Sequence, residues 1–394
     1  MTMDYRNHLN HIRTLGTNEL LKRAKRIERI ERSRGVLRVA LLGSKSMQFL
    51  AEGCKYGFSC LEYDVSVYQS DYNGILSSVL DDASAFNHQQ FDCVILIPDA
   101  RDFYDFPPLF SSAEVCQDWV EKQVGIWQRI WDKISENQQN ALILYANFVI
   151  DPLRLFGQME PALSTSKAVL INRLNQRLFE NRRAIGVDFE GLASNIGKNN
   201  WFDPMNYYLS KLPFRFDCLP QVVFELVSAF ENHMSSSRKV LVLDLDNTLW
   251  GGVIADESVS GINLDPNNAV GEAFLGFQAY VQALYERGVI LAVASKNDLD
   301  VAMEGLNHPN MILKPAMFAS IQANWDAKSV SLQRIADALN LGIDAFERHG
   351  NVARLTGFQN TGLGQHHQMR PVDGPKTFDM VVLGAVEQRR QHGF

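Results

Sequence analysis

The chain has 394 residues, of which 46% are hydrophobic, and its formal net charge is −7 at pH 7. This length and hydrophobic content predict two domains, each with a core of its own. The mildly acidic balance argues against binding to nucleic acid or to an anionic membrane surface. The apolar runs are only as long as strands, and the first residues lack an apolar signal core. We therefore expect a cytoplasmic protein without a membrane span.

The five cysteines indicate neither a disulfide framework nor a zinc site. Their number is odd, and no two of them form a CxxC pair. Cys93 lies in a strand-like run and is interpreted as a buried filler. The five residues are Cys54, Cys60, Cys93, Cys116 and Cys218.

Residues 1–34 are predicted to contain an amphipathic helix. Leu20, Ala24, Ile27 and Ile30 follow helical spacing, with basic and acidic residues between them. Such a helix either packs on the body of the protein or serves as a partner-docking arm. The acidic residues among the basic ones suit a solvated helix face, so packing on the body is favoured.

Strand-like and helix-like segments alternate between residues 35 and 234. The predicted strands are 36–42, 61–68, 91–97, 141–150 and 184–189, and the predicted helices are 46–56, 115–134 and 163–179. This alternation predicts an α/β domain with a parallel sheet and helices on both faces. The polar stretch 235–239 marks the boundary to a second domain.

The second domain begins with an apolar run, Val240 to Leu243, that leads into two acids, Asp244 and Asp246. The run is typical of a strand buried on both faces. Open α/β sheets bind ligands at the carboxyl ends of their strands, so these carboxylates are placed to surround an ion or a phosphate. The glycines at 251–252 then allow the chain to leave the sheet sharply.

Residues 244–254 read DLDNTLWGGVI, which resembles the Asp-x-Asp-x-Thr motif of the haloacid dehalogenase-like superfamily. The whole string is similar to that of the FkbH-like family, and residues 187–190 and 201–204 also resemble this family. The resemblance implies an α/β fold in which an SGNH-hydrolase-like domain precedes a haloacid dehalogenase-like Rossmannoid domain. It further implies a magnesium-dependent phosphatase and glyceryltransferase. Such an enzyme loads a glyceryl unit from 1,3-bisphosphoglycerate onto an acyl carrier protein in polyketide-type biosynthesis.

The same resemblance assigns roles to the residues of this string. Asp244 would be the nucleophile that forms an aspartyl-phosphate, and Asp246 would be the acid and base. Thr248 would help to hold the site and the phosphate. Mg²⁺ would lie on Asp244 and the backbone carbonyl of Asp246, with its other ligands supplied by a fourth motif.

Two later segments match the second and third motifs of the superfamily. The strand predicted at 289–294 ends at Ser295, which takes a phosphate-binding role by its position, with Asn297 beside it. Ser295 is equally suited to cap a helix. Lys328 opens an apolar-periodic helix and matches the lysine that balances charge at the nucleophile, although a lone lysine is more often a surface charge. The family often has a cysteine before the serine, whereas Ala294 stands here.

The first domain departs from the SGNH hydrolase pattern. Ser44 follows Gly43 without the intervening acid of the Gly-Asp-Ser block, and it is either a nucleophile or a helix cap. The late Asp-x-x-His block would be near residues 203–206, which contain no histidine. Without that base the serine is not activated. The domain is therefore interpreted as a non-hydrolytic scaffold or a carrier-docking surface.

The resemblance ends at about Phe346. The fourth motif should follow as an apolar strand ending in paired acids that bind magnesium, but residues 347–394 contain no such pair. We expect weaker magnesium binding and an exposed edge of the sheet. A shifted reading frame is one hypothesis, which the other two frames of the gene would test. A short strand is predicted at 378–383, and the pair His366-His367 is not interpreted as a metal site.

Three functions stay open at the level of the sequence. The first is the glyceryl-transferring enzyme, the second a small-molecule phosphatase with the same residues, and the third a non-catalytic, degenerate binding protein. The predicted domains are an N-terminal helix or arm (1–34), the SGNH-like domain (35–234), the haloacid dehalogenase-like domain (238–346) and an aberrant, poorly structured tail (347–394).

Overall fold

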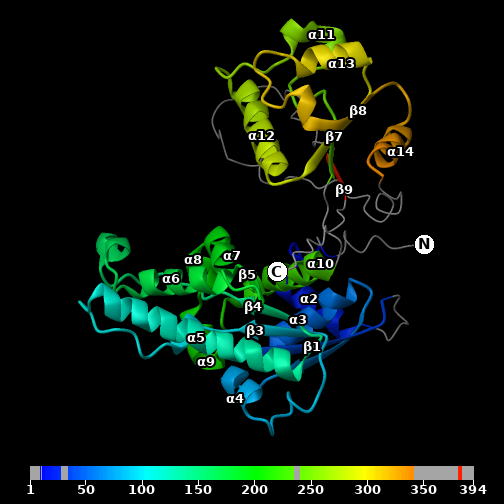
Figure 1. The fold of residues 1–394 in the computed structure, drawn as a ribbon. Coiled ribbons are helices and arrows are strands. Elements are labelled where there is room, and N and C mark those ends of the chain that lie inside the picture. The colour runs from blue at the N-terminus through cyan, green and yellow to red at the C-terminus, as the bar shows by residue number, and fades with distance from the viewer. Residues whose placement is uncertain (1–8, 10, 28–33, 235–239, 341–379, 384–394) are drawn as a thin grey trace, which may run out of the picture. The chain divides into compact units, whose positions relative to one another are not determined.

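The computed structural model describes residues 9, 11–27, 34–234 and 240–340, and the backbone of residues 380–383 (Figure 1). The chain divides into two compact units, Met1–Met234 and Ser235–Phe394. Each unit has one sheet with helices packed on it, so the fold class is α/β, as the alternating segments predicted. Within these described ranges, no helix is both long enough and apolar enough to cross a membrane.

The first unit is organised around a five-stranded sheet in which every neighbouring pair is parallel. The strands are β1 (Val36–Gly43), β2 (Asp64–Gln69), β3 (Cys93–Ile97), β4 (Leu142–Ala146) and β5 (Ile185–Val187), in the order β2-β1-β3-β4-β5. The parallel sheet predicted from the sequence is confirmed. Every residue of β3 is buried, as expected for a central strand that is covered on both faces.

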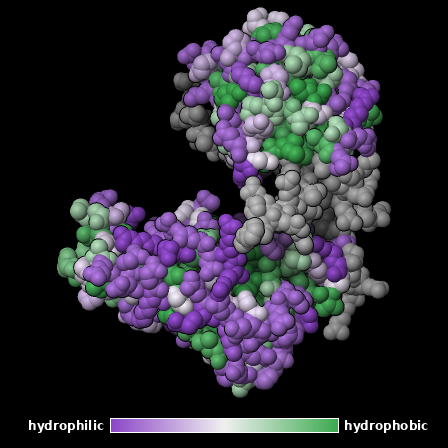
Figure 2. All heavy atoms as spheres, viewed as in Figure 1, coloured by the Kyte–Doolittle hydropathy of each residue, from purple (hydrophilic) through white to green (hydrophobic). Residues whose placement is uncertain are grey.

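Helices cover both faces of this sheet (Figure 1). One face carries α2 (Thr17–Lys25), α3 (Gln48–Ser59) and α10 (Leu219–Met234), and the other carries α4 (Gly74–Leu80), α5 (Ala113–Asn137) and α6 (Lys167–Phe179). Successive residues of β1 point to opposite faces, so Val39 and Leu41 enter the first core whereas Ala40 and Leu42 enter the second. On the side of this unit that Figure 2 shows, hydrophilic residues dominate and hydrophobic ones form smaller patches.

The helix α2 packs its apolar face on the first unit. Leu20 is fully buried and Ala24 nearly so, and the helix lies against α3. On its more exposed side, Glu19 and Arg23 form an ion pair at i and i+4, with Oε1 and Nε 2.8 Å apart. The apolar face is therefore occupied by the body of the protein and is not open to a partner.

Short helices follow β5, namely α7 (Phe189–Ile196), α8 (Lys198–Trp201) and α9 (Pro204–Ser210). The prediction of a strand as far as Phe189 was wrong, because this residue begins α7. The carboxylate of Asp188 caps that helix by accepting a hydrogen bond from the backbone N–H of Gly191 at 3.0 Å. The local cap therefore decides where the strand gives way to a helix.

The second unit has a four-stranded sheet in the order β8-β7-β6-β9. Its parallel strands are β6 (Val240–Leu243), β7 (Ile290–Ser295) and β8 (Phe318–Ala323), and β9 (Met380–Leu383) runs antiparallel to β6. One face packs with α11 (Ile254–Gly261), α12 (Ala269–Glu286) and α13 (Leu299–Leu306), and the other with α14 (Lys328–Ala338). The core between α14 and the sheet is small. Ile335 is the one large side chain of α14 that is fully buried, and it packs with Val240 and Val242.

The sequence predicted an exposed edge of the sheet, but the free side of β6 is paired with β9. Val240 lies opposite Leu383, and Leu243 lies opposite Met380. Pairing satisfies the open N–H and C=O groups of an edge strand, so the expectation of a bare edge was wrong for β6. The rest of the expected tail, including the pair His366-His367, lies outside the described residues.

The cysteines are expected to resist thiol reagents in the folded protein. All five are buried free thiols, and burial raises the pKa of Cys54 to about 12 and that of Cys218 to about 11. Because the thiolate is the reactive form, labelling with a chromogenic disulfide at pH 8 should be slow until urea exposes all five. The folded-state pKa of Cys54 lies above the reference value of 9.0, so the folded chain holds this proton more tightly than the unfolded chain does. The free energy of unfolding should therefore decrease as the pH rises above 9.0. Rapid labelling of the native chain at pH 8 would contradict this prediction.

Candidate active site

The chain turns sharply after β6, and this turn presents Asp244 and Asp246. Asn247 has a left-handed backbone with φ 53°, and its Oδ1 accepts a hydrogen bond from the N–H of Gly252 at 3.0 Å. Gly252, with φ 98°, lies in the region that favours glycine. The loop therefore folds back at once, and the two acids lie at the carboxyl end of the strand, where open sheets bind ligands.

Asp244 is paired with Lys328. The Nζ of Lys328 lies 2.8 Å from Oδ2, and Oδ1 accepts the backbone N–H of Leu245 at 2.9 Å. Lys328 is the first residue of α14, which follows β8, so the parallel sheet returns this lysine to the edge that holds Asp244. Its side chain is 42% exposed, so solvent screening makes the pair a weak source of stability. The pair does, however, fix a positive charge beside the carboxylate of Asp244.

Asp246 has different partners from Asp244, although it lies only two residues further on. Its Oδ1 accepts the indole N–H of Trp250 at 3.0 Å and the backbone N–H of Ile254 at 3.1 Å, and its Oδ2 accepts Nδ2 of Asn297 at 2.8 Å. Among the described residues, three N–H donors and no cation hold this carboxylate. Neither Trp250 nor Ile254 was predicted as a site residue, although both belong to the string that carries the family resemblance.

Ser295 and Asn297 come from the end of β7. Both side chains are buried, and Nδ2 of Asn297 lies 3.2 Å from Oγ of Ser295. Because β6 and β7 are parallel, with Leu243 opposite Val293, their carboxyl ends meet at one edge of the sheet. Oδ1 of Asn297 is buried and has no hydrogen-bond partner among the described residues, so it is an acceptor available at the site.

Thr248 forms hydrogen bonds within the loop after β6. Among the described residues it forms none with the carboxylate of Asp244 or of Asp246. Its backbone N–H donates to the carbonyl of Leu245 at 3.1 Å, and its hydroxyl lies 3.5 Å from the carbonyl of Asp246, the limit of a hydrogen bond. The six residues predicted for the site stand on the loop after β6, at the end of β7 and at the start of α14: Asp244, Asp246, Thr248, Ser295, Asn297 and Lys328. Their chemical roles stay predictions.

A buried glutamine of α12 braces the same loop. Gln278 is fully buried, and its Nε2 donates to the carbonyl of Leu249 at 2.7 Å. Its Oε1 accepts the backbone N–H groups of Ile312 at 2.8 Å and Leu313 at 3.3 Å. Gln278 was not predicted from the sequence, where its only signal is a single amide side chain on the apolar face of a helix.

If Mg²⁺ binds as the family resemblance implies, the carboxylate of Asp244 and the backbone carbonyl of Asp246 would hold it. Magnesium commonly takes one or two protein carboxylates and completes its shell with water and substrate phosphate, so these donors fit a loosely held ion. No group of three His, Cys, Asp or Glu side chains in the described part of the chain could hold a metal. The affinity for magnesium should therefore depend on the bound phosphate.

The serine at the end of β1 lacks the partners of a nucleophile. Ser44 is buried, and its Oγ has no hydrogen-bond partner among the residues that the structure describes. The adjacent Lys45 is also buried and is paired with Asp102. Asp203, which lies where a catalytic acid was sought, caps α9 by accepting the backbone N–H of Asn206 at 3.0 Å. The first unit thus presents no activated serine at this position.

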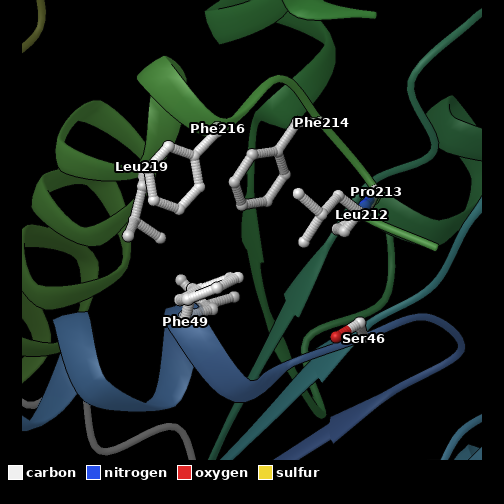
Figure 3. A pocket seen from close by; sticks show the side chains of 8 residues that line it. Ser46, Phe49, Leu212, Pro213, Phe214, Phe216 and Leu219 are labelled. Atoms are coloured by element: carbon white, nitrogen blue, oxygen red, sulfur yellow. The ribbon is translucent and has the colours of Figure 1, made fainter. Parts of the chain in front are cut away.

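The first unit also contains a pocket with an apolar lining (Figure 3). Phe49 from α3 faces Phe214 and Phe216, which precede α10, and Ser46 lies at one end. Its lining includes no titratable side chain, so the pocket offers no group for acid–base or nucleophilic chemistry. The carboxylate and lysine of the second unit are therefore the stronger candidate for an active site.

Fold and site together define an α/β protein with an Asp-x-Asp-x-Thr segment at the end of a central parallel strand, and with a lysine on its first acid. Residues 38–229 match the family model of the FkbH N-terminal domain. Most of the first unit is therefore similar to the FkbH N-terminal domain. None of the proteins with a curated function matches it significantly.

Among solved structures, the chain is similar to the N-terminal part of the protein BF1531 from Bacteroides fragilis, which contains a phosphatase domain and was crystallised with Mg. The two are 24% identical, with a TM-score of 0.72 over 84% of this chain and 87% of that chain. This likeness establishes the fold. A second structure, of a protein from Slackia heliotrinireducens described as a candidate SGNH hydrolase, has 9% identity and a TM-score of 0.33 over 50% of this chain and 98% of that one.

Proposed function

We propose that this protein is a phosphatase-type enzyme that forms an aspartyl-phosphate on Asp244. The observation that carries the proposal is the 2.8 Å pair of Lys328 and Asp244, beside an Asp246 that is held by N–H donors alone. An anionic nucleophile can approach an anionic phosphate only if fixed positive charge offsets the repulsion. The match of residues 38–229 to the FkbH N-terminal domain and the fold shared with a phosphatase-containing protein support the proposal.

The reaction divides between the two carboxylates. An oxygen of Asp244 forms a bond to phosphorus while the bond between phosphorus and the leaving oxygen breaks. Asp246 gives a proton to the leaving oxygen and later takes one from the water that hydrolyses the aspartyl-phosphate. Oδ1 of Asp246 accepts two N–H groups, whereas Oδ2 accepts only the amide of Asn297, so Oδ2 is the atom that carries this proton. A magnesium ion on Asp244 and the carbonyl of Asp246 would neutralise charge on the phosphate.

We also propose 1,3-bisphosphoglycerate as the phosphorylated glyceryl substrate and an acyl carrier protein of polyketide-type biosynthesis as the partner. The match of residues 38–229 to the FkbH N-terminal domain, together with the family resemblance of residues 244–254, supports this narrower proposal. The thiol of the carrier's phosphopantetheine arm would attack the acyl carbon, and the acyl-bound phosphate would leave. The site at Asp244 would then remove the phosphate that remains as an ester on the glyceryl group.

The experiment incubates the purified chain with Mg²⁺, 1,3-bisphosphoglycerate and a phosphopantetheine-bearing carrier protein. It measures released phosphate and the intact mass of the carrier. Phosphate release with a glyceryl mass on the carrier supports both proposals, whereas release without carrier labelling identifies a small-molecule phosphatase. A folded chain that releases no phosphate above the buffer rate rejects both and favours a non-catalytic binding protein.

Replacing Trp250 with phenylalanine should lower the rate of phosphate release roughly tenfold. The ring stays buried, but Oδ1 of Asp246 loses the indole donor at 3.0 Å and keeps only the N–H of Ile254. One lost charge-assisted hydrogen bond is worth about 1.5 kcal/mol, and that is close to a factor of ten. Trp119→Phe is the matched control, because Trp119 donates to Asp105 at 3.3 Å in the first unit and is buried too. A similar loss of rate in both variants would contradict the prediction.

A further inference from the structure

Trp325 is the one tryptophan whose side chain is largely open to solvent. It is 66% exposed, whereas the other five of the six tryptophans are at most 7% exposed. The buried ones are Trp119, Trp127, Trp131, Trp201 and Trp250. An exposed aromatic ring leaves a large apolar area in contact with water, which is unfavourable for the free protein. Such a ring suggests a surface that another molecule covers.

The ring is held in place although it is exposed. Its indole N–H donates to Oδ1 of Asp298 at 2.9 Å. The residue before it, Asn324, donates its backbone N–H to the carbonyl of Ser295 at 3.1 Å, and the residue after it, Asp326, is paired with Arg334 at 2.8 Å. An aromatic ring that is already fixed loses little conformational freedom when a ligand packs on it.

Both ends of the loop that carries Trp325 are attached to the candidate active site. Ala323, the last residue of β8, lies opposite Ser295, and Lys328 bonds to Asp244. Two chain steps of about 3.8 Å place Trp325 within about 8 Å of Ala323, measured between Cα atoms. Asp298, which holds the indole, follows directly after Asn297 in the sequence. The ring therefore belongs to the rim of the site that contains the carboxylates.

We infer that the exposed face of Trp325 packs on the organic group of the phosphorylated substrate and so selects for it. This inference rests on the proposed function, because that function places the phosphate at Asp244 and the organic group outward, toward the loops after β7 and β8. The substrate class is a phosphate ester whose organic group continues beyond the phosphate site, as a phosphoglyceryl group on the arm of a carrier protein would, and phenyl phosphate is the probe for the contact with the ring. Acetyl phosphate has no aromatic group to pack on the ring, whereas phenyl phosphate brings a ring that can stack on an indole.

The first test measures quenching of tryptophan fluorescence by acrylamide in the full chain. Quenching in the native protein should come mainly from Trp325, and it should be lost in Trp325→Phe. Saturating phenyl phosphate with Mg²⁺ should reduce the quenching constant at least twofold, and inorganic phosphate should leave it unchanged. Equal quenching with and without phenyl phosphate would overturn the inference, whether or not the chain is catalytically active.

The second test compares two substrates in Trp325→Ala. The KM for phenyl phosphate should rise about fivefold, which is the usual size of one aromatic contact, while kcat and the KM for acetyl phosphate stay within twofold. Tyr280→Ala, which removes another exposed ring of the second unit from α12, is the matched control and should change neither KM. Unchanged KM for phenyl phosphate with normal turnover of acetyl phosphate would refute the role of Trp325 and leave the phosphatase proposal intact. If the parent protein itself does not turn over acetyl phosphate or phenyl phosphate, the phosphatase proposal is refuted instead.

Discussion

Replacing Asp244 with asparagine should reduce magnesium-dependent phosphate release by about a thousandfold or more, because the amide cannot form the aspartyl-phosphate. The substitution keeps the size of the side chain and leaves an amide oxygen that can still accept the N–H of Leu245 at its present 2.9 Å. It also removes the anionic partner of Lys328, which is partly exposed and can be solvated by water. The fold should therefore persist while the chemistry is lost, and phosphate release against time measures the difference.

Asp337→Asn is the matched control for this substitution. Asp337 lies exposed on α14, and its Oδ1 accepts a side-chain hydrogen bond from Gln333 at 2.8 Å. The rate in this variant should stay within twofold of the parent, since exposed substitutions away from the site rarely matter. Equal phosphate release by the Asp244→Asn chain and the parent, with both folded by circular dichroism, would exclude Asp244 as the nucleophile.

The place of Asp244, Ser295 and Lys328 could be anticipated from the sequence because it depends on a simple rule. Parallel strands present their carboxyl ends at one edge, so residues that follow two buried apolar runs come close together however far apart they are in the chain. The start of the next helix completes the same edge. The 2.8 Å contact of Lys328 with Asp244 is the direct result of that topology.

The donors around Asp246 could not be anticipated in the same way. They depend on the path of the loop, which is set by the positive φ of Asn247 and Gly252 and is invisible in a pattern of apolar residues. The strand β8 was not predicted either, because its residues alternate poorly, and its pairing with β7 is interrupted by a register shift between Leu291 and Ala292. The edge partner β9 pairs across a long separation in sequence, and local periodicity says nothing about such pairings.

The second large effect should come from a residue that touches no proposed substrate. Gln278→Leu is expected to lower the free energy of unfolding of the second unit by about 3 kcal/mol or more, since each buried polar group left without a partner costs about 1–3 kcal/mol. The leucine has a similar volume and a comparable helix propensity, so neither packing nor the helix itself explains such a loss. The substitution leaves three backbone groups without the hydrogen bond that Gln278 provides: the carbonyl of Leu249 and the N–H groups of Ile312 and Leu313.

Hydrogen exchange followed by mass spectrometry is the suitable measurement, because it reports the opening of residues 240–340 separately from the first unit. Gln282→Leu, one turn further along α12 and only half-buried, is the matched control and should stay within about 0.5 kcal/mol of the parent. Faster exchange in Gln278→Leu alone would show that the amide stabilises the loop after β6. Because Leu249 belongs to the loop that holds Asp246, the same variant should also release phosphate more slowly. Equal protection in the two glutamine variants would mean that the hydrogen bonds of Gln278 are replaced without loss, and the brace would then have no energetic role.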